Sequence, residues 1–152
     1  SFIFAMVISL LFLVVFIFLI FKKIKFVLIT ISCLLIGVLL TIFFMIIFRI
    51  NFNFANMISL PLLFSLGVSY PVYFLRRYLE LKSIESVINS KTPSAIFLSA
   101  MTTICSFSTL AISSHQGTSS MGILLFISLS MTIISSMFFL PIIMSTIKIS
   151  AK

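Results

Sequence analysis

The sequence predicts an all-α fold, a polytopic bundle of membrane-spanning helices. Of the 152 residues, 62% are hydrophobic and 8% are charged, whereas soluble domains carry about 25% charged residues. The mean hydropathy of +1.40 excludes a water-soluble fold. Five uncharged runs are long enough to be spans, since a bilayer core of about 30 Å needs about 20 apolar residues, and transmembrane β-strands are shorter and alternating.

These runs predict five transmembrane helices in one membrane domain that covers residues 1–152. The polar stretch 76–92 (RRYLELKSIESVINSKT) follows the third run. Its apolar residues recur at helical spacing, which predicts an interfacial helix on the cytoplasmic membrane surface; a solvated linker is the alternative. The predicted spans are residues 2–21, 26–48, 55–75, 94–113 and 121–147.

The charges predict how the chain is oriented in the membrane. Ten Lys and Arg against two acids give a formal charge of +8, but the basic residues lie between the spans. They form no patch on a water-soluble face, so no nucleic-acid partner is predicted. If odd-numbered spans end in the cytoplasm, nine of the ten basic residues are cytoplasmic and only Arg49 is outside. The positive-inside rule then predicts an N-terminus outside and a C-terminus in the cytoplasm.

Groups that could carry chemistry are missing from the spans. No Asp, Glu, Lys, Arg or His lies in their interior, and the only acids are Glu80 and Glu85 of the polar stretch. Acid–base catalysis needs a titratable group in a cleft, and metal catalysis needs clustered ligands. Cys33 and Cys105 each lie alone in a span, and we interpret both as packed thiols. The sequence therefore predicts no enzyme, no catalytic residue, no metal site and no cofactor.

Small and hydroxyl-bearing residues recur in the third and fourth spans, mostly three or four residues apart. We interpret them as a close helix–helix contact between these two spans, since small residues let helix backbones approach in lipid. The alternative is that they line a transport pathway. Two prolines bracket the third span, and a proline at mid-membrane predicts a hinge. The packing or pathway residues are Ser65, Gly67, Ser69, Ser99, Thr103 and Ser106, and the hinge residues are Pro61 and Pro71.

Four short motifs occur in a specific order: FNFANMISLPLL at 52–63, TPSAI at 92–96, SAMTT at 99–103 and SSHQGTSSMG at 113–122. They resemble FNFANIIALPLL, TPRAV, SALTT and SSHPGTASMG in the second membrane half of RND-superfamily transporters of the MMPL branch, and most closely in the members associated with hopanoid biosynthesis. The resemblance covers about residues 50–145. The first two spans match that family only in hydrophobicity.

The resemblance implies a transporter that moves a hopanoid or another hydrophobic lipid from the inner membrane toward the outer envelope, driven by protons. It also implies partners outside this chain, namely an N-terminal membrane half and a periplasmic domain, and we expect the protein to continue upstream of Ser1. A homo-oligomer in the lipid bilayer is left open. Two alternatives also stay open: a sterol-sensing-like module that binds lipid without transport, and an MMPL-type exporter of another lipid or a drug.

One departure from the family pattern concerns the coupling ion. Many RND transporters carry a carboxylate in the third span of this half, directly after a Gly-Val pair, where this chain has Ser69 after Gly67 and Val68. A serine does not bind and release protons near neutral pH. We therefore expect the coupling carboxylates in the missing half, and we expect these 152 residues alone to be inactive in transport.

Overall fold

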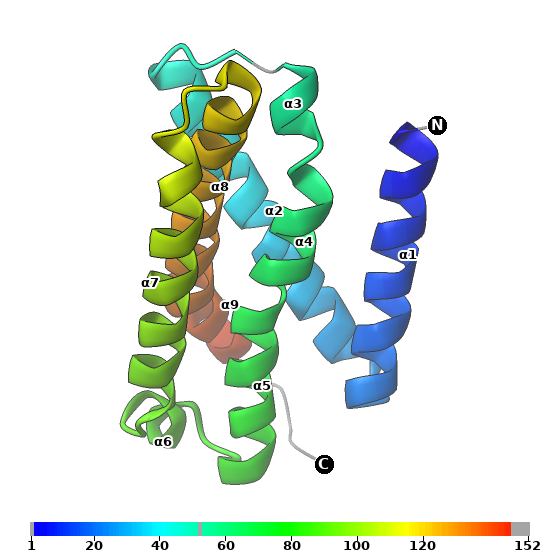
Figure 1. The fold of residues 1–152 in the computed structure, drawn as a ribbon. Helices are drawn as coiled ribbons and strands as arrows, with labels where there is room; N and C mark the ends of the chain where they lie inside the picture. The colour runs from blue at the N-terminus through cyan, green and yellow to red at the C-terminus, as the bar shows by residue number, and fades with distance from the viewer. Residues whose placement is uncertain (1, 52, 147–152) are drawn as a thin grey trace.

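The computed structural model describes residues 2–51 and 53–146, and this part of the chain forms an all-α membrane helical bundle (Figure 1). The predicted fold class is confirmed. Three helical segments within the described part are long and apolar enough to cross a bilayer: Ile24–Ile47, Thr92–Ala111 and Gln116–Thr146. The elements are α1 (Phe2–Phe21), α2 (Ile24–Ile47), α3 (Phe54–Met57), α4 (Leu60–Gly67), α5 (Ser69–Leu81), α6 (Ile84–Ile88), α7 (Thr92–Ala111), α8 (Gln116–Ile134), the π-helix η1 (Ser135–Phe139) and α9 (Leu140–Thr146).

The helical segments run up and down between two ends of the bundle (Figure 1). One end holds α6 and the connection between α1 and α2, and we call it the α6 end. The opposite end, the α3 end, holds α3 and the connection between α7 and α8. Helix α8 is central, because it contacts α2, α3, α4 and α7. Its side chains therefore take part in most of the close helix contacts.

The side chains are distributed as expected for a protein surrounded by lipid. Large apolar side chains cover the outside; Phe12, for example, is 70% exposed and Leu39 is 65% exposed. Several hydroxyls are buried inside, and those of Thr30, Thr41 and Thr132 donate to the carbonyl one helical turn earlier, at 2.7–2.8 Å. Lipid tails are as apolar as leucine, so small and hydroxyl-bearing residues can occupy helix contacts while large apolar residues face outward.

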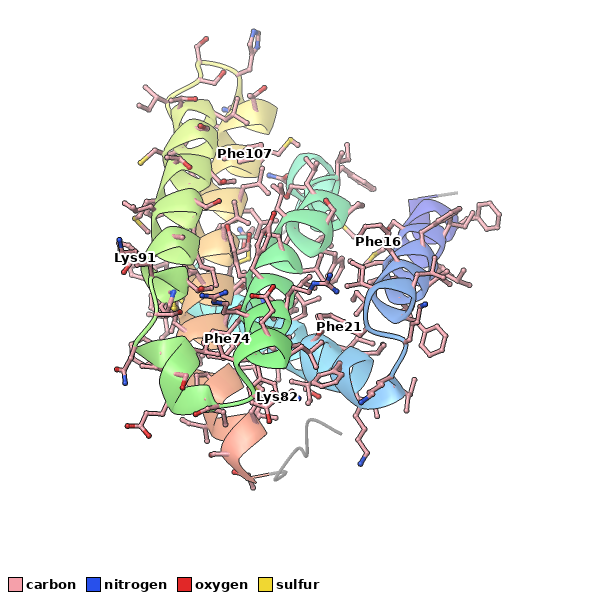
Figure 2. All side chains as sticks on the ribbon, turned by 90° about the horizontal axis from the view of Figure 1, so that it is seen from below. Phe16, Phe21, Phe74, Lys82, Lys91 and Phe107 are labelled. Carbon is pink, nitrogen blue, oxygen red and sulfur yellow. The ribbon has the colours of Figure 1, made fainter. Side chains whose placement is uncertain are left out.

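The apolar core lies mainly toward the α6 end. Its members include Phe26 of α2, Phe74 of α5 and Leu129 of α8, each at most 2% exposed. Figure 2 views the bundle from below and labels Phe21 and Phe74, two members of this core from α1 and α5. The core thus ties α1 and α2 to α5 and α8 at one end of the bundle.

The predicted third span, residues 55–75, is interrupted twice. Helix α3 ends at Met57 before α4 begins at Leu60, and Val68 separates α4 from α5. Pro61 and Pro71 are the second and third residues of α4 and α5, where a helix leaves backbone N–H groups unpaired in any case. Each interruption lies within three residues before one of the two prolines. Their action as hinges stays a prediction.

The polar stretch 76–92 does not form the single interfacial helix that its pattern predicts. Helix α5 continues from the apolar run as far as Leu81, because Tyr78 still packs into the core with 6% exposure. Lys82 then ends the helix in a left-handed conformation, with φ of 55°. The rest is a short helix, α6, whose Val87 is fully buried against the protein. Packing of individual side chains, which periodicity does not reveal, explains the difference.

Left-handed residues end three of the apolar helices. Lys22 follows α1, Arg49 lies just beyond α2, and Lys82 follows α5, with φ values between 52° and 55°. Glycine usually occupies this position, since a side chain disfavours positive φ. A basic side chain offsets part of that cost by interacting with the negative end of the helix dipole. The basic residues therefore mark the edges of the apolar runs and also the ends of these helices.

Candidate functional site

Gly67 lies at a close contact between three helices. A Cβ atom built at Gly67 of α4 would lie 2.9 Å from Cγ2 of Thr132 on α8 and 3.3 Å from Cδ2 of Leu34 on α2. At Gly37 of α2, a Cβ would lie 3.0 Å from Oγ1 of the same Thr132. An added side chain would force a shift at Gly67 and would be tight at Gly37, so glycine lets these helices lie close together. We call Gly37, Gly67 and Thr132 the glycine–threonine contact.

This contact corrects the predicted partner of Gly67. The small residues of the third span were expected to pack on the fourth span, which is α7. Gly67 instead faces α8 and α2. Sequence reasoning missed Gly37 and Thr132. A signal was present, since Gly37 is a lone glycine in the middle of the second run, but nothing in the sequence indicates which helix it touches.

The two serines beside Gly67 do not share its contact. Ser65 is exposed, and its hydroxyl donates to the carbonyl of Leu62 at 3.1 Å. Ser69 is partly buried at the first residue of α5, and its hydroxyl donates to the Leu66 carbonyl at 2.6 Å. The Ser65 bond stays within α4, and the Ser69 bond links the start of α5 to the end of α4, so neither hydroxyl joins this segment to another span.

The hydroxyl stripe of α7 lies on the outside of this chain. Ser99 and Ser106 are exposed, and Thr103 is half-buried. Their helix satisfies them: Thr103 donates to the Ser99 carbonyl at 2.9 Å, and Ser106 donates to the Thr102 carbonyl at 2.8 Å. The buried face of α7 carries Ile96, Ala100 and Ile104 instead. The stripe is therefore mostly a polar surface of an apolar helix, and only Ser99 borders the space between α7 and α5.

We expect replacement of Ser106 by leucine to leave the stability of this chain almost unchanged. The side chain is exposed and bonds only to its own helix, and surface substitutions usually change stability by less than about 0.5 kcal/mol. Unfolding of the chain in detergent micelles measures the effect. A loss comparable with that of a substitution at Gly67 would show that the stripe is a packed face.

A second close contact joins α7 to α8. A Cβ at Gly122 of α8 would collide with the backbone of α7, 2.7 Å from the carbonyl carbon of Leu110 and also against the backbone nitrogen of Ala111. The hydroxyl of Ser119 donates across the same junction to the Ala111 carbonyl at 2.7 Å. The motif SSHQGTSSMG therefore forms a tight hairpin between α7 and α8. The motif contributes to the family resemblance, but the sequence does not predict Gly122 as a packing residue.

The two cysteines differ from each other. Cys33 is fully buried, with its sulfur 3.4 Å from Oγ of Ser135, and Ser135 donates to the Cys33 carbonyl at 2.7 Å. Cys105 is exposed, which differs from its prediction as a packed thiol. Within residues 2–51 and 53–146, no three His, Cys, Asp or Glu side chains are grouped so that they could hold a metal ion.

Comparison with known proteins identifies the family. No family model matches the chain. The chain is 36% identical over 115 residues to the hopanoid transporter HpnN of Burkholderia multivorans, an alignment that covers 76% of this chain and 13% of that protein. It is 35% identical over 123 residues to the hopanoid transporter HpnN of Rhodopseudomonas palustris, covering 81% and 14%. The chain belongs to the family of these transporters. This is the MMPL branch of the RND superfamily, as the four motifs predict.

The chain spans only about one seventh of the length of the relatives that it matches. It therefore aligns with one portion of these longer RND-family relatives. Its glycine–threonine contact and its α7–α8 hairpin are structural features of that portion. The roles of the exposed hydroxyls of α7 and of the interrupted segment α3–α5 depend on the parts of the transporter that lie around this portion.

Proposed function

We propose that the chain is the C-terminal membrane half of an RND-type transporter that moves a hopanoid or a similar hydrophobic lipid toward the outer envelope. The observation that carries this proposal is the identity of about one residue in three over most of the chain to two hopanoid transporters. The helical bundle agrees with it, because its outside is apolar and its inside is close-packed.

The arrangement of α4 and α5 favours a supporting role for this half in proton coupling. Ser69 lies at the junction of the two helices, in place of the carboxylate of related transporters, and its hydroxyl donates to the Leu66 carbonyl of α4. The only acids of the chain, Glu80 and Glu85, lie beyond the apolar run. Proton coupling then depends on carboxylates of the N-terminal half. The segment α3–α5 supplies an interrupted helix that can bend at its two breaks.

A chimera tests this function. The aligned segment of the Rhodopseudomonas transporter is replaced by that of this chain, and the chimera is produced in a strain that lacks its own transporter. We expect it to restore hopanoid to the outer-membrane fraction, because the exchanged segment preserves the helix contacts described above. Hopanoid in separated inner and outer membranes is measured by mass spectrometry.

Two controls make the chimera informative. A second chimera with Gly67→Leu should reach the membrane poorly, because leucine does not fit against Thr132. A third with Ser106→Leu should behave like the first in membrane insertion. Normal insertion of the unmodified chimera without any movement of hopanoid would contradict the proposed substrate and leave another lipid or a drug as the cargo.

We also propose that the α6 end faces the cytoplasm and that the chain lies in the bacterial inner membrane. The described residues carry seven basic side chains at the α6 end, on the α1–α2 connection, the start of α2, α5, the α5–α6 connection and the α6–α7 connection. One basic residue, Arg49, lies at the α3 end. Lys148 and Lys152, which the sequence also assigns to the cytoplasm, lie outside the described residues. This asymmetry supports the orientation through the positive-inside rule.

Single-cysteine labelling tests the orientation. In the full-length protein with Cys33 and Cys105 replaced by alanine, a cysteine at position 115 should react with a membrane-impermeant maleimide in intact spheroplasts. A cysteine at position 86 should react only after permeabilisation. His115 and Ser86 are both exposed and lie at opposite ends of the bundle, so accessibility is matched. The opposite labelling pattern would contradict the proposed orientation.

A further inference from the structure

A cavity of about 360 Å³ lies between α5 and the first turns of α7, at the α6 end of the bundle. Helix α5 lines it with Tyr73, Arg76, Arg77 and Glu80, and α7 contributes Thr92 and Ile96 among others. Figure 2 labels Lys82, which follows α5, and Lys91, which precedes α7. In the sequence both lysines lie between the two segments that line the cavity. The cavity is thus part of the basic end of the molecule.

The two arginines are incompletely paired. Arg77 donates from Nη1 to Oε2 of Glu80 at 2.6 Å, while its Nε is buried without any hydrogen-bond partner. Arg76 is exposed, and among the residues that the structure describes it has no hydrogen-bond or ion-pair partner. Two guanidinium groups against one carboxylate leave one positive charge in excess and several free N–H donors. This arrangement favours an anion with several acceptor oxygens.

The start of α7 adds to the positive potential. The N-terminal turn of this 20-residue helix borders the cavity through Thr92, whose N–H already donates to Oγ of Ser90 at 3.2 Å, so the turn acts through its dipole and the Thr92 side chain. The positive end of a helix dipole attracts anions, and phosphate groups bind there frequently. The Thr92 side chain also brings a hydroxyl that can donate to a phosphate oxygen.

The surroundings indicate that the anion belongs to a lipid. Arg76 directly follows the apolar run that ends at residue 75, and a charged residue at that position marks the edge of the hydrocarbon layer. Tyr73, 62% exposed, lies nearly one turn deeper, as aromatic side chains do at a membrane interface. Ile96 provides an apolar wall on α7. A phosphate at the arginines would therefore have its acyl chains alongside α5 and α7.

We propose that the cavity between α5 and α7 binds the phosphate headgroup of an anionic phospholipid of the adjacent leaflet, through Arg76, Arg77 and the start of α7. Basic pockets between transmembrane helices are general sites for anionic headgroups. The phospholipid is a resident of the transporter and differs from the hydrophobic cargo, so the proposal holds whether or not that cargo is a hopanoid.

Native mass spectrometry of the purified full-length protein tests this proposal, with phosphatidylglycerol and phosphatidylcholine as probes. We expect phosphatidylglycerol to bind more tightly, and Arg76→Gln combined with Arg77→Gln to weaken its binding about tenfold, since charge-assisted hydrogen bonds to phosphate are lost. The single variant Arg76→Gln removes no hydrogen bond within the described part of the protein, and it should weaken phosphatidylglycerol binding by less than the double variant does. Lys22→Gln combined with Lys82→Gln removes the same charge at the same end, outside the cavity, and should have little effect.

Three results would overturn the proposal. Equal binding of the two phospholipids would exclude an anion-selective site. Equal weakening in the arginine and lysine double variants would show diffuse attraction to the basic end and no defined cavity. Displacement of phosphatidylglycerol by millimolar inorganic phosphate would show a site for a free anion. Hopanoid movement by the chimera is a separate measurement, so a failed function and a failed phospholipid site are distinguishable.

Discussion

Replacement of Gly122 by alanine should strongly destabilise the chain. The added methyl group would lie 2.7 Å from the carbonyl carbon of Leu110 and 2.8 Å from its Cβ. Most of the atoms in the way belong to the backbone of α7, so no rotamer change can make room. Overpacking typically costs about 1–3 kcal/mol when side chains can rearrange, and we expect a loss at the upper end of that range or beyond.

Gly117 offers a matched control for this prediction. It lies on the same helix five residues earlier and is exposed. Gly117→Ala should therefore stabilise α8 by up to about 1 kcal/mol, because alanine is the better helix former. Both variants are measured by unfolding of the full-length protein in detergent micelles. A mild effect of Gly122→Ala, within about 0.5 kcal/mol of the wild type, would contradict the tight hairpin.

The second large effect is expected at the glycine–threonine contact. Gly67→Ala would place a methyl group 2.9 Å from Cγ2 of Thr132, a buried side chain whose hydroxyl is already bonded to the Ser128 carbonyl at 2.7 Å. Thr132 cannot rotate away without losing that bond, and threonine is stiff at χ1. We expect a loss of about 1–3 kcal/mol for alanine and a larger loss for leucine.

Thr132→Ser distinguishes the contact of Thr132 with Gly67 from its contact with Gly37. Serine removes the Cγ2 methyl that faces Gly67 and keeps the Oγ atom that faces Gly37 at 3.0 Å. It should therefore rescue Gly67→Ala, with a coupling free energy of about 1 kcal/mol in a double-mutant cycle. It should not rescue Gly37→Ala, where the added methyl would also lie 3.1 Å from the Thr132 Cα. Equal rescue of both variants would contradict this geometry.

The ends of several helices could be predicted from the sequence because abrupt changes in composition mark them. Helix α1 covers the predicted residues 2–21, since Lys22 and Lys23 follow the run. Helix α2 was predicted within two residues at its start and one at its end. Charged groups cannot enter the hydrocarbon layer cheaply, so the sequence signal and the physical cause coincide at these positions.

The interior of the bundle could be predicted much less well. The sequence identifies Gly67 as a small residue in a span, but its partners Thr132 and Leu34 lie on helices far away in the chain. The hydroxyl stripe on α7 has the spacing of a packed face and is mostly exposed, while Ile96 and Ala100 form the buried face. In lipid both faces of a helix are apolar enough to be buried, so hydrophobicity does not decide between them.

The polar stretch 76–92 shows a third reason for disagreement. Its apolar residues do recur at helical spacing, but they lie in two separate helices. Tyr78 of α5 and Val87 of α6 pack against the protein. Periodicity alone does not distinguish a partner surface made of lipid from one made of protein. Nor does it reveal Lys82, where the chain turns in a conformation usually reserved for glycine.

The π-helical turn η1 affects how this chain should be aligned with its relatives. A π-turn holds one residue more than the α-helical turn that it replaces, and here it separates α8 from α9 at Ser135–Phe139. Ser136, Leu140 and Met144 stay on the buried side at intervals of four residues. A relative whose helix is regular at this point would present the same face with one residue fewer. A one-residue gap within 135–139 would then be structurally correct, and an ungapped alignment would pair buried residues of one protein with lipid-facing residues of the other.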